Sequence, residues 1–448
     1  MRNRCLLPVV VLLLLAVPLF ADTYPFGGPF TTDNDDSCDI SNLPAATLLL
    51  PYFEVDLDDF EGETTLFTVT NVGDRARVVR VTLWTDVGFP VVSFNIYLTG
   101  YDVQSINLRD IIGSGRIGTE AGTGTSVSPF GPLSRTAGAG YDLTNCTRIP
   151  HLSPAIVAFM QSAFTTGYVP VEGGCTIGRE HTNAVGYATM DVVGECTGTM
   201  PIDSAYFRDE LRYENVLMGE YQQLNPSTAS AQGGTMVHIR AIPEGRKGER
   251  EAGNLPRTFY QRLTSDGASV PVSDARQPLP STFFARWING GPAPFQTSLK
   301  IWRELSTRDL SECDLDDRDP LRTAEIVLFD EAENAFTQAT VPRGEPPQPA
   351  ASETLPASAL VSITDLDVFP IPPNGAQAGW VYLNLDNRDA TATHAEQAWV
   401  ISSMRAEGRY SVDMDATAFG NGCSPRLPQS EITEDGPGVI GPAPNVTP

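Results

Sequence analysis

The chain has 448 residues and is strongly acidic, with 55 aspartates and glutamates against 30 lysines and arginines and a formal net charge of -25. Nucleic acids and anionic membrane surfaces are bound through clustered lysine and arginine, so this charge balance excludes nucleic acid as a partner. The length suffices for two or three domains that each bury a core.

The first 21 residues have the pattern of a secretory signal peptide. Arg2 and Arg4 precede an apolar run over Leu6–Leu15, Pro18 ends this run, and Ala21 offers a small residue for cleavage. No later stretch is long and apolar enough to span a bilayer. The pattern therefore predicts an exported protein that is periplasmic, secreted or associated with the cell surface.

Strand patterns dominate after an extended lead-in, which we expect over residues 22–42. Four runs are rich in β-branched and aromatic residues and are separated by turn residues: Thr64–Thr70, Val78–Trp84, Val91–Leu98 and Val103–Leu108. The last two alternate apolar and polar residues, as half-buried strands do. We expect residues 43–112 to form the core of a first β-sandwich module.

Residues 113–256 are expected to form a loop-rich insert with one amphipathic helix and returning strands. Ser153 can cap the helix, Pro154 suits its first turn and Gly167 can end it, with apolar residues at helical spacing between them. Strand patterns return at Ala184–Val193 and Thr235–Ile242.

A second β-sandwich module is expected over residues 257–423, followed by a disordered tail at residues 424–448 that is rich in proline and glycine. Its strand patterns are Thr282–Asn289, Ser298–Glu304, Ala324–Phe329, Ala359–Leu366, Gly379–Leu385, Gln397–Met404 and Arg409–Thr417. The predicted fold class is mostly β, with two tandem immunoglobulin-like β-sandwich modules and an α-containing insert between them.

A similar residue spacing occurs twice in the chain, and it supports two related modules. Asn71 precedes Trp84 by thirteen residues, and Asn289 precedes Trp302 by the same number, with similar classes of residue around each tryptophan. We interpret this repeated spacing as a sequence repeat between the two modules. Coincidence between two generic strand patterns is the alternative.

Trp84 and Trp302 are the candidate ligand platform. Side chains alternate across a strand, so both indoles lie on the face opposite the apolar residues that flank them. Either the insert or the neighbouring module covers them, or they form exposed faces on which a sugar ring stacks.

Six cysteines remain once Cys5 leaves with the signal peptide, and an even number in an exported chain favours disulfide bonds. We predict a bond between Cys175 and Cys196, which flank a possible hairpin, and one between Cys313 and Cys423. Zinc is disfavoured because the chain has no CxxC motif and its four histidines are scattered.

An acidic turn is the candidate calcium site. Asp314, Asp316 and Glu325 occupy positions 1, 3 and 12 of a twelve-residue calcium-loop register, and Asp317 and Asp319 lie beside them. The register departs from the motif, because Asp319 stands where the loop requires glycine. A solvated acidic turn is the alternative. Calcium is the one cofactor that the sequence suggests.

Catalytic motifs are missing from the sequence. Residues 113–118 match GxGxxG, but no helix pattern follows, so the dinucleotide interpretation fails. Nucleophile-elbow and HExxH motifs do not occur. A carboxylate pair for glycoside hydrolysis stays open, because sequence spacing cannot place two acids across a cleft.

These patterns favour an exported, non-enzymatic binding or structural β-sandwich protein of unknown ligand. Its partner would be a protein or a glycan at the cell surface. The alternative is a carbohydrate-binding or carbohydrate-active protein that uses exposed tryptophan faces.

Overall fold

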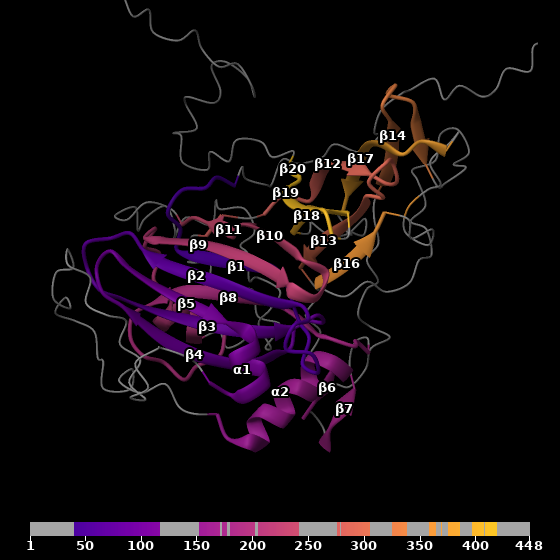
Figure 1. Ribbon diagram of the computed structural model, residues 1–448. Helices are drawn as coiled ribbons and strands as arrows, with labels where there is room; N and C mark the ends of the chain where they lie inside the picture. Colours follow the sequence, from indigo (N-terminus) through magenta and orange to yellow (C-terminus); the bar gives the residue numbers. More distant parts are fainter. Residues whose placement is uncertain are drawn as a thin grey trace, which may run out of the picture.

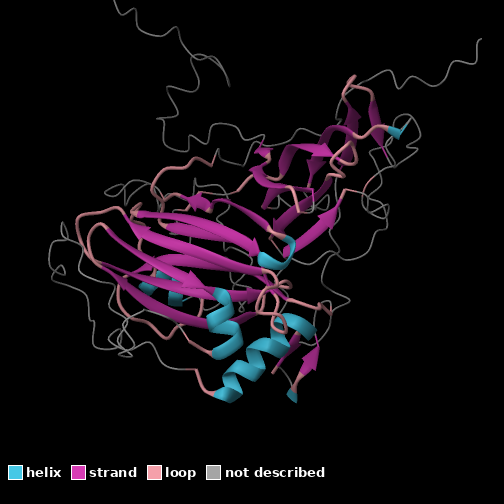
Figure 2. Cartoon of the chain, viewed as in Figure 1, coloured by secondary structure: helices cyan, strands magenta, loops and turns pink. Residues whose placement is uncertain are grey.

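The computed structural model describes residues 40–116, 152–170, 173–176, 180–201, 205–241, 276–277, 279–304, 325–337, 358–363, 369, 375–385, 397–406 and 408–418. In these residues the chain has twenty β-strands and two α-helices, so the expected mostly-β class is confirmed (Figures 1 and 2). The strands form two pairs of larger sheets and one small ribbon.

The first half of the structure, residues 40–241, contains a five-stranded and a four-stranded antiparallel sheet. In spatial order, the five-stranded sheet consists of β11 (Val237–Ile239), β1 (Thr47–Val55), β8 (Ala184–Val193), β3 (Arg77–Thr85) and β4 (Pro90–Leu98). The four-stranded sheet consists of β10 (Ser230–Thr235), β9 (Leu217–Asn225), β2 (Thr64–Asn71) and β5 (Asp102–Asn107). Strands β1, β3 and β8 are buried on both faces, which explains why apolar residues occur on both faces of each strand.

The second α-helix lies where the capping pattern predicts it. Helix α2 (Pro154–Thr166) follows α1 (Leu108–Ser114); the side chain of Ser153 accepts a hydrogen bond from the backbone N–H of Ile156, and Gly167 ends the helix in the left-handed conformation. The apolar face of α2 packs on the first half through Phe164, whose ring meets Phe53 edge-on at 5.3 Å. Short elements complete this part of the chain: β6 (Tyr168–Val169), β7 (Cys175–Thr176), the π-helical turn Tyr206–Glu210 and the 3-10 turn Pro226–Thr228.

The strands expected in an insert are integral to the sheets of the first half. Strand β8 lies between β1 and β3 in the five-stranded sheet, and β9 lies between β2 and β10 in the four-stranded sheet. Residues 184–239 therefore complete the same two sheets that residues 47–107 begin.

The second half, residues 276–418, again contains a five-stranded and a four-stranded sheet. The five-stranded sheet consists of β20 (Thr417–Ala418), β12 (Thr282–Ile288), β17 (Ala378–Asn384), β14 (Glu325–Asp330) and β15 (Ala335–Thr337), in this spatial order. The four-stranded sheet consists of β19 (Tyr410–Asp415), β18 (Ala398–Ala406), β13 (Gln296–Arg303) and β16 (Ser358–Ser362).

The two halves share one strand order. When β1 to β5 are matched with β12 to β16, and β8 to β11 with β17 to β20, every strand falls in the corresponding sheet with the corresponding neighbours. The strand match shows that Trp84 and Trp302 are not equivalent residues, although their similar spacing in the sequence indicates equivalence. Trp84 lies in β3, whereas Trp302 lies in β13, the counterpart of β2. The similar spacing around the two tryptophans reflects generic strand patterns.

A buried threonine makes the same hydrogen bonds in both halves. The Thr65 hydroxyl donates to the Glu54 carbonyl oxygen at 3.0 Å and accepts from the Glu54 N–H at 3.1 Å. The Thr297 hydroxyl donates to the Ile288 carbonyl oxygen and accepts from the Ile288 N–H, both at 2.8 Å. In each half these two hydrogen bonds join the second strand, β2 or β13, to the end of the first strand, β1 or β12.

A glycine in the central strand of each five-stranded sheet also occupies matching positions. Gly186 in β8 pairs with Phe53, and Gly379 in β17 pairs with Trp287. A Cβ atom at Gly186 would collide with the carbonyl oxygen of Trp84, and a Cβ atom at Gly379 would collide with that of the matching residue, Phe329. Glycine is therefore required at both positions by close backbone approach.

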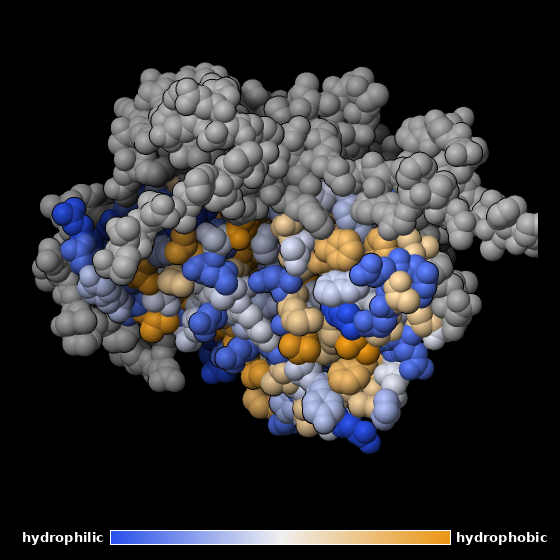
Figure 3. Space-filling model, turned by 90° about the horizontal axis from the view of Figure 1, so that it is seen from above, coloured by the Kyte–Doolittle hydropathy of each residue, from blue (hydrophilic) through white to orange (hydrophobic). Residues whose placement is uncertain are grey.

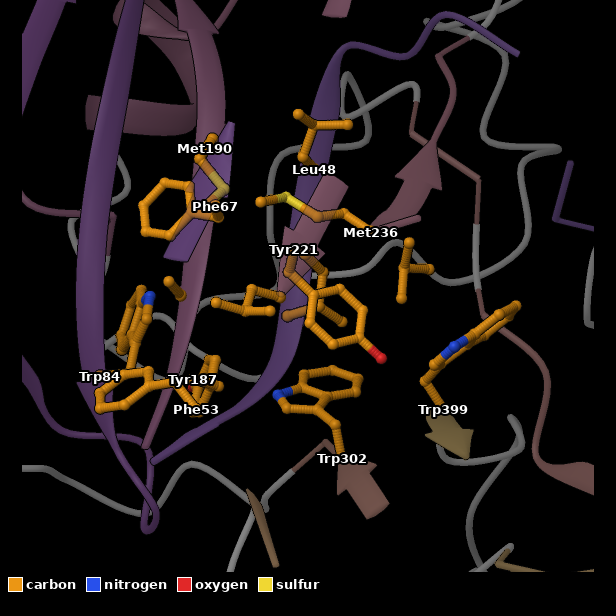
Figure 4. Packing of buried hydrophobic residues seen from close by; sticks show 14 of the residues in the cluster. Leu48, Phe53, Phe67, Trp84, Tyr187, Met190, Tyr221, Met236, Trp302 and Trp399 are labelled. Atoms are coloured by element: carbon orange, nitrogen blue, oxygen red, sulfur yellow. The ribbon is translucent and has the colours of Figure 1, made fainter. Parts of the chain in front are cut away.

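The two halves are packed against each other by a shared hydrophobic core. One cluster of buried residues runs through both, from Leu48 and Phe67 in the first half to Leu299 and Val400 in the second. Figure 4 shows some of its aromatic members, with Trp302 beside Tyr221 and the Trp84 and Tyr187 rings close together. Seen from above, hydrophobic residues on the described surface occur in small groups among hydrophilic ones (Figure 3).

Candidate functional site

Trp84 and Trp302 lie inside the structure, where they are 0% and 1% exposed. Tyr187 of β8 connects them, because its ring stacks on Trp84 at a centroid distance of 5.7 Å and meets Trp302 edge-on at 6.0 Å (Figure 4). Of the two interpretations, the structure agrees with the one in which neighbouring segments cover both rings, and neither ring forms an exposed stacking face. The reason is that the outer face of the sheet containing β13 packs on the first half, so its large indole is buried.

A buried ion pair lies at this junction between the halves. Lys300 Nζ in β13 lies 2.5 Å from Asp413 Oδ2 in β19, and both side chains are 1% exposed. From the first half, the Tyr221 hydroxyl in β9 donates to the same Oδ2 at 3.0 Å, and the Tyr221 ring centre lies 5.5 Å from Nζ. We call Lys300, Asp413 and Tyr221 the junction cluster.

Burial shifts the pKa values of Lys300 and Tyr221. It lowers the pKa of Lys300, because the charged ammonium is removed from water, while the adjacent Asp413 carboxylate opposes this shift. Burial also raises the pKa of Tyr221, and the Asp413 charge adds to that effect, so the phenol keeps its proton and remains a donor.

A second polar contact between the halves surrounds Arg405. Its Nε donates to Gln232 Oε1 at 3.0 Å, and its Nη2 lies 3.4 Å from Glu63 Oε1. The Ser403 hydroxyl donates to the same Gln232 oxygen at 3.3 Å. The Arg405 side chain is partly exposed, so this pair orients the halves more than it stabilises them.

An open pocket of about 390 Å³ lies at another part of the junction. Trp399 and Asp415 of the second half line one wall, and the Trp399 Nε1–H donates to Asp415 Oδ1 at 3.4 Å. Burial raises the pKa of Asp415, and the Trp399 hydrogen bond opposes that shift. The remaining lining residues are Ile40, Ser41, Asn42, Met236, Val237, Ala416 and Ala418. We call this cavity the junction pocket; an indole beside a carboxyl suits a small ligand with an apolar face and hydroxyl groups.

One exposed tryptophan was not singled out from the sequence. Trp380 in β17 is 39% exposed, and the Arg286 guanidinium lies 5.1 Å from the centre of its ring. Phe284 lies beside Trp380 at 5.8 Å and beside Phe329 at 5.7 Å. The sequence pattern could have identified this residue, because the alternation of side chains along a strand places Trp380 and Tyr382 on one face of the strand expected over Gly379–Leu385.

An aspartate–histidine pair lies near the end of β3. His181 Nε2 and Asp86 Oδ2 are 2.8 Å apart. The nearby Ser358 binds the Asp86 carbonyl oxygen through its backbone N–H, but its hydroxyl donates to the carbonyl oxygens of Pro51 and Gly186. This serine is therefore committed to joining the halves and is not hydrogen-bonded to the histidine.

The predicted calcium and disulfide residues are described only in part. Outside the described residues lie Asp314, Asp316, Asp317, Asp319, Cys313 and Cys423. Glu325 begins β14 and is buried, and the described parts of the chain contain no group of three or more histidine, cysteine or acidic residues that could hold a metal ion. Cys175 lies in β7 and Cys196 follows β8; each is disulfide-bonded, and their pairing with each other stays a prediction.

The described helices include none that is long and apolar enough to cross a membrane. Comparison with known proteins gives no relative, since no family model, no curated protein and no solved structure matches this chain.

Proposed function

We propose that the chain is an exported, non-enzymatic binding or structural protein built from two tandem immunoglobulin-like β-sandwich modules that behave as one rigid unit. The observation that carries this proposal is the repeated strand order together with the buried junction. Each half has nine described strands divided five and four between two antiparallel sheets, which is the strand number of a variable-type immunoglobulin sandwich.

The junction supports a rigid unit rather than two flexibly linked modules. Rings from both halves interlock at Tyr187 and Trp302, and the Lys300–Asp413 pair is covered by Tyr221 from the other half. Separating the modules would expose these rings and leave a charged pair at a new surface. Large apolar interfaces of this kind resist domain motion.

The polar groups of the junction support a non-enzymatic role. Lys300, Asp413 and Tyr221 bind one another in the interior, and Ser358 bonds to backbone carbonyl oxygens. Such contacts hold two modules in a fixed orientation, which suits a protein that presents loops or faces to a partner.

Denaturant unfolding of the full chain tests the rigid unit. Tryptophan fluorescence and far-UV circular dichroism, followed in urea, should give coincident single transitions, because the halves share one core. Two separated transitions would contradict the proposal. Export is tested by expressing the chain with its N-terminus intact in a bacterial host, and an unprocessed chain retained in the cytoplasm would contradict it.

A second candidate function, binding of a small glycan, is favoured by the junction pocket. Trp399 and Asp415 offer an apolar wall and a carboxyl acceptor, which is the combination that a sugar ring requires. A ligand at a hundredfold excess over its Kd stabilises the folded state by about 2.7 kcal/mol. Thermal melts across a panel of oligosaccharides should therefore show a shift that Asp415→Asn reduces; a flat panel would remove this candidate and leave the first.

A further inference from the structure

The junction cluster places an amine and a carboxyl group in direct contact inside the protein. Lys300 Nζ and Asp413 Oδ2 are 2.5 Å apart, and both side chains are 1% exposed. We propose that Lys300 and Asp413 form an intramolecular isopeptide bond between Nζ and Cγ, which links β13 covalently to β19. This inference concerns a covalent modification and does not depend on the proposed function.

The surroundings favour amide formation over a lasting ion pair. Removing two charges from water is costly, and their attraction offsets this cost only with good geometry and further hydrogen bonds. One carboxylate oxygen, Asp413 Oδ1, is buried and has no hydrogen-bond partner within the described residues. An amide removes both charges. Burial lowers the pKa of Lys300, which increases the fraction of neutral, nucleophilic amine.

The reaction is balanced without any further reactant. A proton passes from the Lys300 ammonium to Asp413 Oδ2, which gives a neutral amine and a neutral carboxyl group. The Nζ lone pair then bonds to Cγ, the Cγ–Oδ2 bond breaks, and Oδ2 leaves as water with the transferred proton and a second proton from Nζ. Oδ1 remains as the amide oxygen, and no atom is oxidised or reduced.

Neighbouring groups assist these steps by position. The Tyr221 hydroxyl donates to Oδ2, the oxygen that leaves, and its raised pKa keeps that proton in place. The fold holds the two reacting groups together, and well-oriented intramolecular reactions gain effective concentrations on the order of 10⁵ M or more. Tyr221 is therefore a positioning residue for the reaction.

The choice of lysine at position 300 is unusual for this chain. Lysine occurs at only two positions, Lys247 and Lys300, while the other basic residues are arginines. Another buried ion pair, between Asp191 and Arg276, uses arginine. A guanidinium stays protonated and cannot act as the nucleophile, so an arginine would supply the charge at position 300 but not this reaction.

Amine labelling of the denatured chain tests the proposal, with Lys247 as the internal control. The purified full chain is reduced, denatured in guanidinium and treated with an amine-reactive acetylating reagent before digestion and tandem mass spectrometry. The expected result is full acetylation of Lys247, no acetylation of Lys300, and a branched peptide joining Lys300 to Asp413 that is lighter than its two parts by one water. Full acetylation of Lys300 would overturn the proposal and leave an ion pair only.

Two variants assign the bond to these residues. Asp413→Ala should restore acetylation of Lys300 and remove the branched peptide, and this readout on denatured protein does not require the variant to be stable. Tyr221→Phe keeps the ring but removes the hydroxyl, and it should slow bond formation after refolding of freshly synthesised chain. A dehydrated Asp413 without attachment to Lys300 would indicate a succinimide and would also overturn the proposal.

Discussion

The two halves of the molecule share a strand order but differ in what covers their five-stranded sheets. In the first half, the paired residues Trp84 and Tyr187 are both buried, and Trp302 from the second half packs against Tyr187. At the matching positions of the second half, Phe329 pairs with Trp380, which is 39% exposed. The same sheet position is thus a buried contact in one half and a partly open surface in the other.

This difference shows that the strand order determines the position of an aromatic pair in the sheet. Whether the pair is buried depends on which other part of the chain packs against that position. The matched glycines and threonines act within one half, so we expect them to have equal effects in both. The aromatic residues act between halves, so we expect unequal effects.

The largest effect should come from truncating the aromatic contact between the halves. Trp302→Ala removes a ring that is 1% exposed, and we expect a loss of about 3 to 5 kcal/mol in the free energy of unfolding. Trp380→Ala, which truncates a tryptophan of the same half that is 39% exposed, is the control, with an expected loss of about 1 kcal/mol because only aromatic and cation contacts at a partly exposed site are removed. Urea unfolding measures both, and equal losses would contradict the assigned difference between a ring buried at the junction and a ring on the partly open surface.

The matched glycines should respond alike to a methyl group. Gly186→Ala and Gly379→Ala each force a Cβ atom into a backbone carbonyl oxygen, and we expect each to cost about 2 to 3 kcal/mol. A Cβ atom at Gly198 meets nothing within 4 Å, so Gly198→Ala serves as the control. If only one of the two central-strand variants is destabilised, the halves are less alike than their strand order indicates.

The matched threonines also test whether the two halves are equivalent, with a smaller expected loss of stability. Thr65→Val and Thr297→Val keep the shape but leave a backbone N–H and a carbonyl oxygen without the hydroxyl, at an expected cost of about 1 to 2 kcal/mol each. Thr70→Val, on the opposite and half-buried face of β2, is the control. Costs for Thr65 and Thr297 that differ by more than their errors in urea unfolding would break the equivalence.

The smallest effect should be a pH dependence from His238 in β11 of the first half. Its Nε2 accepts from the Gly219 N–H, and burial lowers its pKa below the ordinary value of 6.5, although bonds to Gly219 and Leu43 oppose the shift. Below about pH 6.5 the unfolded state therefore binds more protons than the folded state, so stability falls as the pH falls.

Comparison with His238→Gln isolates this contribution. Wild type should lose stability relative to the variant between about pH 7 and pH 5, by about 1.4 kcal/mol for each unit of pKa shift. Urea unfolding at several pH values gives the difference. Parallel profiles would show that His238 does not titrate differently in the two states.

Much of the secondary structure could be predicted from the sequence, because local signals determine it. The β-branched runs gave β2 to β5, and Ser153, Pro154 and Gly167 bounded α2 correctly. The site was harder to predict. Lys300 and Asp413 are more than a hundred residues apart, and nothing local shows that their side chains meet.

Alternation along each strand, by itself, determined that Trp84 and Trp302 lie opposite their apolar neighbours, since side-chain direction follows from backbone geometry. Whether those faces were open to a ligand was decided by tertiary structure, because the cover comes from Tyr187 and from the packing of one half on the other. Which residues of the two halves correspond was also decided by tertiary structure, since strands of similar composition can be told apart only by their neighbours in a sheet.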